Sequence, residues 1–446
     1  MMRALLPPAR RLGPAVIVGL AAAWAVLWFA AEPPGQPATA YLGQFFGAES
    51  VLLLSIALVL ISTLPWVEGV FDGIDRAAIW HRRVAITGMV LLVPHILLSV
   101  NPHRSRLGPL LAVIGAVGLL ILAVWAILPR WRSLIPRALH RPVLAVRRLP
   151  GLRDLGKKMG GYELWRSVHR LTGLFVAAGF LHGLLDGTPF PRAQLLRWSY
   201  VAIGGIGLAF YLYRELLARH FVPLYDYQVT EVHDVGAGIT EIALAPLGRP
   251  AAFAPGQFAM LYLEGIDGWH RHPFTITSAA GNNLLRFAIK ALGDNTTQLR
   301  GVVQPGMPAV IRGPFGRFSH RKGTSRQLWI AGGIGVTPFL SWLRGLEEQP
   351  LRGPVDFFYT SSGPDMPYAD EIKTLAADSD LVHVHFVDTR DGRLTAQQVL
   401  ASAREKPAAL SAFLCGPASM VRNFESAFRH AGVPSRNIYR EYFDWR

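Results

Sequence analysis

Four histidines of this chain lie inside strongly apolar stretches, where an ionisable side chain is costly and usually functional. They form two pairs: His81 with His95, fourteen residues apart, and His169 with His182, thirteen residues apart. A single histidine in such a place is most simply a polar residue that is hydrogen-bonded to its neighbours. Because neutral imidazole is a common metal ligand, two pairs at matching depths instead predict two stacked haems, each held by two histidines.

Six apolar runs provide the elements that would position these histidines. Each has close to the ~20 residues that a membrane-spanning helix needs. The first run resembles a signal peptide in position, but it is long for one, and no clear cleavage site precedes Glu32. We therefore expect a retained helix and a membrane six-helix bundle. The runs lie near residues 12–31, 43–65, 78–100, 108–128, 163–186 and 195–217.

Helix geometry explains one of the two spacings. Fourteen residues turn through about 1400°, close to four full turns, so His81 and His95 share a helix face. Thirteen residues do not return to one face, and ideal geometry gives no reason for the spacing of His169 and His182. Either spacing separates the members of a pair by roughly 20 Å along the helix. Three glycines of the fifth run should let a flat macrocycle approach its backbone: Gly173, Gly179 and Gly183.

The positive residues predict an orientation. Lys and Arg are absent from 32–50, whereas ten of them lie in the connection 129–166. Because cytoplasmic loops carry the excess of positive charge, both termini and the soluble half should be cytoplasmic. The predicted location is the inner cell membrane, with the first histidine of each pair toward the cytosol. This pattern explains the net charge of +15 better than nucleic-acid binding, so the expected partner is the lipid membrane and not nucleic acid.

Composition divides the chain into two halves and limits its redox chemistry. Of the 446 residues, 51% are hydrophobic, and the mean hydropathy is +0.28. The apolar residues are concentrated before about residue 220. The single cysteine, Cys415, excludes an intramolecular disulfide, a four-cysteine zinc site and a cysteine-ligated iron–sulfur cluster. Any redox cofactor must be held by histidines or by non-covalent binding.

The two histidine spacings, on the third and fifth of six apolar helices, resemble the ferric reductase-type membrane domain. NADPH oxidases and ferric-chelate reductases share this domain. The resemblance implies a domain over 1–220 that binds two haem b groups, with the four histidines as iron ligands. His103 and His140 lie outside the runs and are interpreted as surface residues. Three arginines beside the inner histidines pair with haem propionates or anchor the inner membrane edge: Arg82, Arg83 and Arg170.

After residue 220 the sequence has the patterns that are typical of two soluble domains. Strand patterns near 227–232, 239–245, 257–263, 274–278, 285–291 and 309–312 predict an antiparallel β-barrel over 221–322. Strands and helices then alternate over 323–446, which predicts an α/β doubly wound parallel sheet. The order of barrel and sheet, and the segments FAPGQF and GPFG, resemble the ferredoxin–NADP reductase superfamily. That resemblance implies an FAD domain followed by an NAD(P)H domain.

The segment HPFTITS at 272–278 resembles the flavin site of the NADPH oxidases. His272 stands where many soluble relatives have Arg. A second flavin segment follows at 287–299, in which Lys290 can neutralise pyrophosphate and a tight turn leads into a helix. The implied flavin-binding residues are His272, Pro273, Phe274, Thr275, Thr277, Ser278, Lys290, Gly293 and Thr296.

The segment AGGIGVTPF at 331–339 follows a strand and opens a helix. Its glycines allow close backbone approach, and a helix N-terminus favours a pyrophosphate. The segment LCGP at 414–417 ends another strand, and in relatives its cysteine lies beside the nicotinamide, although Cys415 also suits a buried core position. The implied nucleotide-binding residues are Gly332, Gly333, Gly335, Val336, Thr337, Pro338, Cys415, Gly416 and Pro417.

The C-terminal aromatic residues are the last functional candidates. In many relatives a terminal aromatic ring stacks on the flavin and moves aside for nicotinamide. Phe443 matches that position best and Trp445 second, and simple packing on the sheet is the alternative. Together with Cys415, Phe443 is therefore assigned to the hydride-transfer site. We find no need for a catalytic acid or base.

The resulting hypothesis is a bacterial NADPH oxidase-like enzyme. Electrons would pass from cytosolic NAD(P)H through FAD and two haems to an acceptor outside, most simply O2, giving superoxide. Alternatives are a ferric-chelate reductase, a membrane reductase that feeds a quinone or a periplasmic protein, and a haem module with a vestigial flavin domain. Because 359–371 has serines but no Arg, the hypothesis favours NADPH only slightly over NADH.

Overall fold

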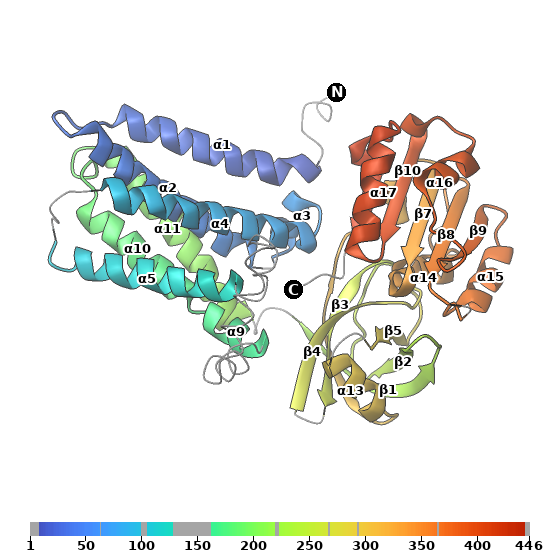
Figure 1. Cartoon of the computed structure of the whole chain (residues 1–446). Helices are drawn as coiled ribbons and strands as arrows, with labels where there is room; N and C mark the ends of the chain where they lie inside the picture. The colour runs from blue at the N-terminus through green and yellow to red at the C-terminus, as the bar shows by residue number, and fades with distance from the viewer. Residues whose placement is uncertain are drawn as a thin grey trace, which may run out of the picture. The chain divides into compact units, whose positions relative to one another are not determined.

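The structure of the chain is a computed structural model, and it describes residues 9–62, 64–99, 105–127, 162–218, 223–265, 268–291, 294–363 and 365–441. By its internal contacts the chain forms two compact units. The first is helical and extends to Arg219. The second begins at His220, and Asp72–Asp75 are grouped with it. Figure 1 shows the elements of both units.

The helical unit contains the six predicted long helices, the fifth of them in two parts, and one short helix that was not predicted. Six helices in the described part of the chain are long and apolar enough to cross a membrane. The unpredicted helix α3 has only seven residues. The elements are α1 (Ala9–Ala30), α2 (Ala38–Leu60), α3 (Pro65–Phe71), α4 (Ile74–Leu98), α5 (Gly108–Ile127), α9 (Tyr162–His169), α10 (Thr172–Asp186) and α11 (Gln194–Leu212), followed by a π-helical turn, Tyr213–Leu217.

The predicted fifth helix is interrupted, which corrects the expectation of one continuous helix over 163–186. Helix α9 ends at His169, and α10 begins at Thr172. Between them the backbone tightens: Leu171 N–H donates to the Val168 carbonyl, and Leu174 N–H to the Leu171 carbonyl. These bonds span three residues instead of four and change the rotation per residue. His169 and His182 therefore lie on two short helices, and their spacing need not fit one ideal helix.

Glycines bring the helices close together, and this changes the interpretation of the fifth run. A Cβ atom on Gly173 would collide with the ring of Tyr211, and one on Gly183 with the Tyr200 hydroxyl. These two glycines therefore make room for α11, and the expectation that they face a macrocycle is wrong. A Cβ on Gly179 would meet no atom within 4 Å. Small residues that allow close helix approach are typical of membrane bundles.

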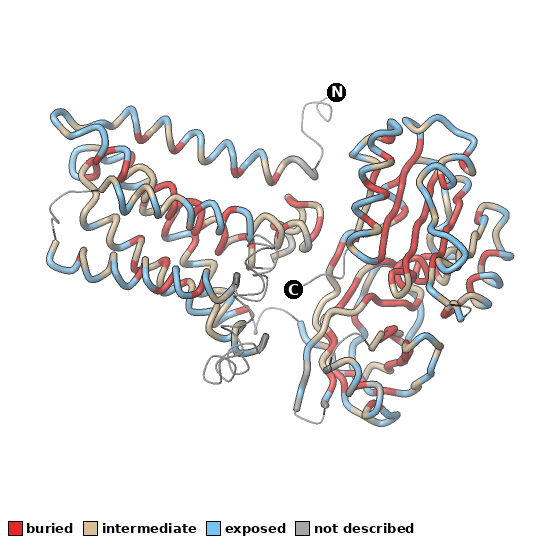
Figure 2. Tube along the Cα trace, in the orientation of Figure 1, coloured by how far each residue is buried: buried red, intermediate tan, exposed pale blue. Residues whose placement is uncertain are grey.

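The helical unit has an aromatic interior and an apolar exterior. Trp28, Tyr41 and Tyr200 are almost fully buried, and the rings of Trp28 and Tyr41 stack with centroids 5.5 Å apart. In contrast, Leu97 and Leu195 are exposed by 70% and 72%. Figure 2 shows that much of α1 and α5 is also exposed. So many exposed large apolar side chains are unusual for a protein surface in water.

The second unit begins with an antiparallel sheet of six strands in the order β4-β3-β6-β1-β2-β5. The fourth strand was expected at 274–278 but begins earlier, because it pairs with β3 from Gly268 to Thr275. The inner face is packed with apolar side chains, among them Leu244, Leu261 and Ile311. The elements are β1 (Leu224–Asp234), β2 (Ile239–Pro246), β3 (Phe258–Gly265), β4 (Gly268–Thr275), β5 (Leu285–Lys290), α13 (Asp294–Val302) and β6 (Pro308–Phe315).

A parallel sheet of five strands follows, in the order β11-β10-β7-β8-β9. The doubly wound α/β fold was predicted, except for its last strand. The strand order reverses between β7 and β10, and ligands of such sheets bind at this switch point. The elements are β7 (Arg326–Gly332), α14 (Thr337–Arg344), β8 (Val355–Ser361), α15 (Ala369–Ala377), β9 (Val382–Asp388), α16 (Ala396–Ala403), β10 (Leu410–Cys415), α17 (Ala418–His430) and β11 (Ile438–Glu441).

A buried arginine joins the two sheets of this unit. Arg344, at the end of α14, donates to Glu241 of β2 at 3.0 Å and to the Thr277 carbonyl at 3.0 Å. It also makes two bonds to Glu371 of α15, at 2.7 and 2.9 Å. Charge-assisted bonds of this kind are strong and directional. Arg344 therefore holds the segment after β4 against the helix that follows the glycine-rich turn.

Candidate functional site

The structure brings the four histidines together as two pairs across α4 and the α9–α10 segment. The ring centroids of His81 and His169 lie 6.5 Å apart, and those of His95 and His182 lie 6.2 Å apart. Each pair has one histidine from the third predicted run and one from the fifth, at matching positions along the two runs. This pairing across the bundle is the one that the depths of the histidines predict, because the first histidine of each run lies toward the same end of its helix.

These distances fit a metal held between two imidazoles. Two metal–nitrogen bonds of about 2 Å, with a ring radius of about 1.1 Å on each side, place trans imidazole centroids ~6.3 Å apart. Among the described residues no group of three or more His, Cys, Asp or Glu side chains could hold a metal ion. Two ligands are sufficient when a macrocycle supplies the other four, as in haem. The residues present therefore fit two bis-histidine haems.

Hydrogen bonds at Nδ1 orient the imidazole rings. His81 Nδ1 lies 2.8 Å from the Ala57 carbonyl, and His95 Nδ1 lies 2.9 Å from the Gly43 carbonyl. His182 Nδ1 lies 3.1 Å from the Gly108 carbonyl. A carbonyl can only accept, so Nδ1 carries the proton and Nε2 is left as the ligand atom. Metal-binding histidines usually have such an outer partner, which sets the tautomer and ring orientation.

His169 is held differently. The Thr172 hydroxyl lies 3.5 Å from its Nδ1 and donates to its backbone carbonyl. The ring of Trp165 stacks on the imidazole, with centroids 4.8 Å apart and planes inclined by 15°. Among the described residues, no backbone carbonyl accepts a hydrogen bond from this ring. Stacking on Trp165 and the turn after α9 therefore position it.

Two glycines beside these ligands were not singled out in the sequence. A Cβ on Gly47 of α2 would come within 2.5 Å of His95 Nδ1. A Cβ on Gly108 would collide with the carboxylate of Asp186, and the carbonyl of Gly108 accepts from His182. Nothing in the local pattern distinguishes Gly47 from other helix glycines, because its role depends on a ring from another helix.

The predicted arginines have other partners. Arg170 forms an ion pair with Glu215, and Arg83 lies 5.0 Å over the ring of Trp80. These contacts favour the anchoring interpretation over propionate binding for both residues. The positive connection 129–161, His103 and His140 lie outside the described residues.

The first flavin segment lies on edge strand β4 and just after it. His272 and Phe274 alternate with Pro273 and Thr275, and the rings of His272 and Phe274 have centroids 6.1 Å apart. Thr275 is 3% exposed, and its hydroxyl has no hydrogen-bond partner among the described residues. A buried polar group without a partner in the chain is what a cofactor contact would satisfy.

The last two residues of the segment face the domain junction. The Thr277 hydroxyl donates to Glu241 at 3.1 Å. The Ser278 carbonyl accepts from the Ser341 hydroxyl at 3.0 Å, and its own hydroxyl accepts from Arg286 N–H. These hydrogen bonds connect the segment to neighbouring parts of the second unit, and direct flavin contact by both residues stays a prediction.

The second flavin segment brings a lysine to the nucleotide turn. Lys290 ends β5, and its Nζ would lie 3.7 Å from a Cβ on Gly333. This places a cation of the barrel beside the glycine-rich turn of the parallel sheet, where pyrophosphate charge is expected. Thr296 lies in α13, and Gly293 lies outside the described residues.

The glycine-rich turn after β7 fits against the end of β10 at the switch point. Gly333 has φ +54° and Gly416 has φ +151°, which favour glycine. A Cβ on Gly335 would collide with the Cys415 carbonyl, and one on Gly332 would come within 2.9 Å of Pro417. Close approach between the two turns therefore requires the predicted glycines.

The other residues of the turn are held by the protein itself. The Thr337 hydroxyl donates to the Ile334 carbonyl at 3.0 Å, and Pro338 occupies the first turn of α14. The side chain of Val336 is fully buried in the core, so only its backbone can face a nucleotide.

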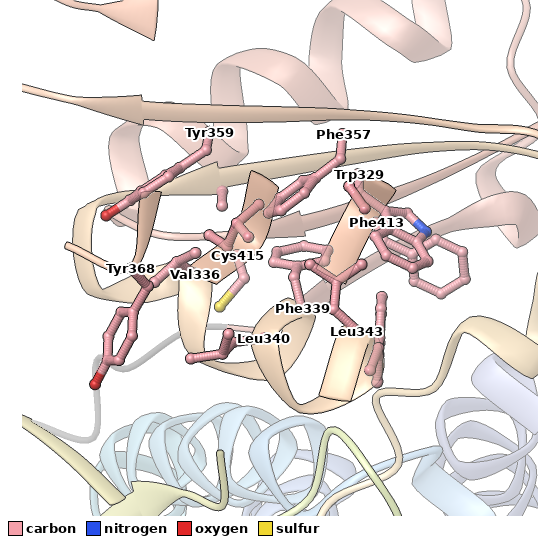
Figure 3. Packing of buried hydrophobic residues seen from close by; sticks show 14 of the residues in the cluster. Trp329, Val336, Phe339, Leu340, Leu343, Phe357, Tyr359, Tyr368, Phe413 and Cys415 are labelled. Carbon is pink, nitrogen blue, oxygen red and sulfur yellow. The ribbon is translucent and has the colours of Figure 1, made fainter. Parts of the chain in front are cut away.

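Cys415 lies in the same core and not on a reactive surface. Its side chain packs in the cluster that includes Val336 and Leu340 (Figure 3). Burial, and secondarily the nearby Glu441 carboxylate, raises the pKa of the thiol well above its ordinary value. A thiol with a raised pKa is a poor nucleophile, so a packing role at the nicotinamide end of β10 fits best. Phe443 and Trp445 lie outside the described residues.

Glu441 is a site residue that sequence reasoning missed. It ends β11 directly opposite Cys415 and is 8% exposed. The short strand β11 was not predicted, and its pairing with β10 places this carboxylate at the switch point. The signal for Glu441 in the sequence was an acidic residue just before the terminal aromatic residues.

The end of β8 carries the groups that would face a nucleotide ribose. Ser361 of β8 lies opposite Asp388 of β9, and Asp388 accepts from Gly363 N–H at 3.3 Å. Arg390 binds both oxygens of Asp388, which holds the pKa of that carboxyl far below its usual range. The guanidinium near this site is therefore already paired with a carboxylate.

Comparisons with known proteins agree with this description of the second unit. Residues 228–331 match a family described as FAD-binding domain, and residues 329–426 match one described as oxidoreductase NAD-binding domain. The ferredoxin–NAD(+) reductase component of the alkene monooxygenase system of Xanthobacter autotrophicus is 27% identical over 226 residues, which cover 48% of this chain and 69% of that protein. The reductase component of propane 2-monooxygenase of Mycolicibacterium smegmatis is 30% identical, covering 45% and 62%.

Among solved structures, the flavohemoglobin from Malassezia yamatoensis, with bound FAD and heme, resembles the chain in fold. Its TM-score is 0.50 at 18% identity, and the match covers 91% of this chain and 97% of that one. Both family matches lie in the second unit. They define the chain as an oxidoreductase with FAD-binding and NAD-binding domains of the ferredoxin reductase type. Its second unit transfers electrons from NAD(P)H through FAD.

Proposed function

We propose that this chain is a membrane-spanning oxidoreductase that carries electrons from NAD(P)H and FAD, through two bis-histidine haems, to an acceptor across the membrane. The observation that carries the proposal is the pair of histidine distances, 6.5 and 6.2 Å. Two unrelated polar pairs would not both have the separation that a metal between trans imidazoles requires. The resemblance of the helical unit to ferric reductase-type domains adds support.

The membrane location is supported by the surface of the helical unit. Its six long helices expose large apolar side chains such as Val90, Ile96 and Leu120. Exposed apolar surface of this kind is stable in lipid and unstable in water. The proposed location is the inner cell membrane, with several spans and both termini in the cytosol, as the distribution of Lys and Arg indicates.

In the proposed mechanism, residues of the second unit bind the donors. The β4 segment around Thr275, together with Lys290, would hold FAD, and the glycine-rich turn at Gly333 would bind the pyrophosphate of the nicotinamide nucleotide. Bound FAD accepts a hydride from NAD(P)H and passes its electrons on singly. Arg344 holds the flavin segment and the nucleotide helix in one arrangement, which the hydride transfer requires.

Residues of the helical unit orient the electron path. His81 and His169 would ligate the haem nearer the cytosol, and His95 and His182 the haem nearer the outside. Donation of Nδ1–H to a carbonyl makes Nε2 a better ligand. Bound haem supplies one-electron transfer at iron.

The acceptor follows from the predicted ligands. If His95 and His182 both held the outer haem, an acceptor would have no free site at the iron and would take the electron at the haem edge. Dioxygen, giving superoxide, fits this best. A second candidate function is reduction of a protein acceptor, because the relatives named above are reductase components of multi-component systems. Ferric chelates and quinones are further acceptors for the test.

The experiment that tests the proposal is anaerobic spectroscopy of the purified full chain. We expect about two low-spin b-type haems and one FAD per chain, all reduced by NADH or NADPH. Chains with one haem or none would contradict the proposal. Readmission of air with superoxide dismutase, or addition of a ferric chelate, then identifies the acceptor.

A substitution separates the two haem sites. His95→Leu should remove the outer haem, leave flavin reduction intact and stop electron flow to the external acceptor. His430→Leu, a change of an exposed histidine in the second unit, is the matched control and should alter nothing. Unchanged flow in the His95 variant would rule out the route.

A further inference from the structure

Asp186 places a carboxylate beside one of the four histidines. It lies one turn after His182 on α10, and its Oδ2 is 3.5 Å from His182 Nδ1. Both side chains are largely buried, with 10% and 17% exposed. The interaction therefore takes place in a region of low dielectric constant, where a charge acts strongly on its neighbours.

The same carboxylate shapes the loop that binds this histidine. Asp186 Oδ1 accepts from Ser105 N–H at 3.0 Å, and the Ser105 hydroxyl accepts from Leu107 N–H and Gly108 N–H. These bonds fix the turn before α5, whose Gly108 carbonyl accepts from His182 Nδ1. Asp186 thus acts on His182 directly through its charge and indirectly through the Gly108 carbonyl.

The other three histidines have neutral partners at Nδ1 among the described residues. His95 is the closest comparison, because Ser99 also follows it by four residues and lies 3.1 Å from its Nδ1. His81 has the Ala57 carbonyl, and His169 has the Thr172 hydroxyl. In the part of the chain that the structure describes, a carboxylate lies at Nδ1 in the outer pair only, whereas the charged group that acts on the inner pair is the Arg214 guanidinium.

We propose that Asp186 is a positioning residue that acts through His182 to lower the reduction potential of the outer haem. This inference rests on the proposed function. A carboxylate at Nδ1 gives the imidazole more anionic character, which favours the oxidised iron. Its negative charge also opposes the addition of an electron nearby. The outer haem would thereby be more reducing than it would be without this carboxylate, which suits a one-electron acceptor that is difficult to reduce, as dioxygen is.

The test is an anaerobic redox titration of the full chain, followed by its haem spectra. In Asp186→Asn, one haem should become easier to reduce by about tenfold in its reduction equilibrium, which is ~59 mV for a one-electron couple, while the other haem is unchanged. Its low-spin electron paramagnetic resonance signal should shift as well. The control Ser99→Ala removes one neutral partner of His95. It should shift the reduction potential of either haem by less than Asp186→Asn does.

Two further variants make the test robust. Asp186→Glu keeps the charge and should retain the wild-type order of potentials, and Asp186→Ser is a second neutral change that retains an acceptor for Ser105 N–H. The proposal is overturned if both haems shift equally, if neither shifts, or if both neutral variants lose a haem. Fewer than two haems in the wild-type protein would instead refute the proposed function itself.

Discussion

At the scale of single residues, the choice of nicotinamide depends on the ends of two neighbouring strands. NADPH differs from NADH by a 2′-phosphate, which usually requires an arginine near the end of the second strand. At this position the chain has Ser361, and the nearby Arg390 is bound to Asp388. Because Asp388 already neutralises the charge of Arg390 and binds two of its nitrogens, we expect a preference for NADH, whereas the sequence had slightly favoured NADPH.

We predict that kcat/KM is higher for NADH than for NADPH, measured by anaerobic flavin reduction. Asp388→Asn removes the charge that holds Arg390 and should raise kcat/KM for NADPH several-fold, because the released guanidinium can then form charge-assisted hydrogen bonds to the 2′-phosphate. The value for NADH should change little. Lys373→Gln, an exposed change on α15, is the control. A wild-type preference for NADPH would contradict this prediction.

At the scale of elements, the ligands depend on helices that carry no ligand themselves. Helix α2 supplies the carbonyls of Gly43 and Ala57 to His95 and His81, and it approaches α4 closely at Gly47. The positions of the imidazoles are therefore set by the packing of α2 against α4, in addition to the spacing along α4.

We predict that Gly47→Ala disturbs the outer haem selectively, because the new methyl group would come within 2.5 Å of His95 Nδ1. Haem content should fall from two toward one per chain, or the spectrum of one haem should change, as measured by pyridine haemochrome and absorption spectra. Gly19→Ala is the matched control, since a Cβ there meets no atom within 4 Å. Two unaltered haems in the Gly47 variant would contradict this view of α2.

At the scale of the whole molecule, the second unit has the interior of an independent protein. Its barrel core around Leu261 and its sheet cores around Phe339 and Leu414 are each closed within the unit. Units with their own cores generally fold on their own. The proposed electron path is thus divided between a donor unit with its own cores and a helical unit.

We predict that residues 221–446, produced alone, fold and bind FAD. They should reduce an artificial one-electron acceptor with NADH, and their spectrum should show no haem. The measurements are flavin content, circular dichroism and acceptor reduction. A truncated chain that aggregates or lacks flavin would show that the helical unit is required for folding of the donor unit.

Features that depend on local sequence patterns were predicted, whereas features that depend on contacts between distant residues were missed. Six long helices, a barrel and a doubly wound sheet were predicted because apolar runs and alternating strands are local patterns. Helix α3, strand β11 and the early start of β4 were missed, since β4 and β11 are defined by pairing with β3 and β10, and α3 has seven residues. The interruption at Leu171 was also missed, although the unexplained spacing of His169 and His182 pointed to it.

The sequence alone identified the candidate functional residues: the four histidines, the HPFT segment and the glycine-rich turn are recognisable from residue type and spacing. Only the tertiary structure decided how they are supported. The pairs His81–His169 and His95–His182 were predicted from their depths, whereas backbone carbonyls reach the imidazoles because helices far apart in sequence pack together. Asp186 and Gly47 gain their roles in the same way. Spacing along a helix is encoded locally, whereas the partner of an imidazole across a bundle depends on the packing of the whole chain.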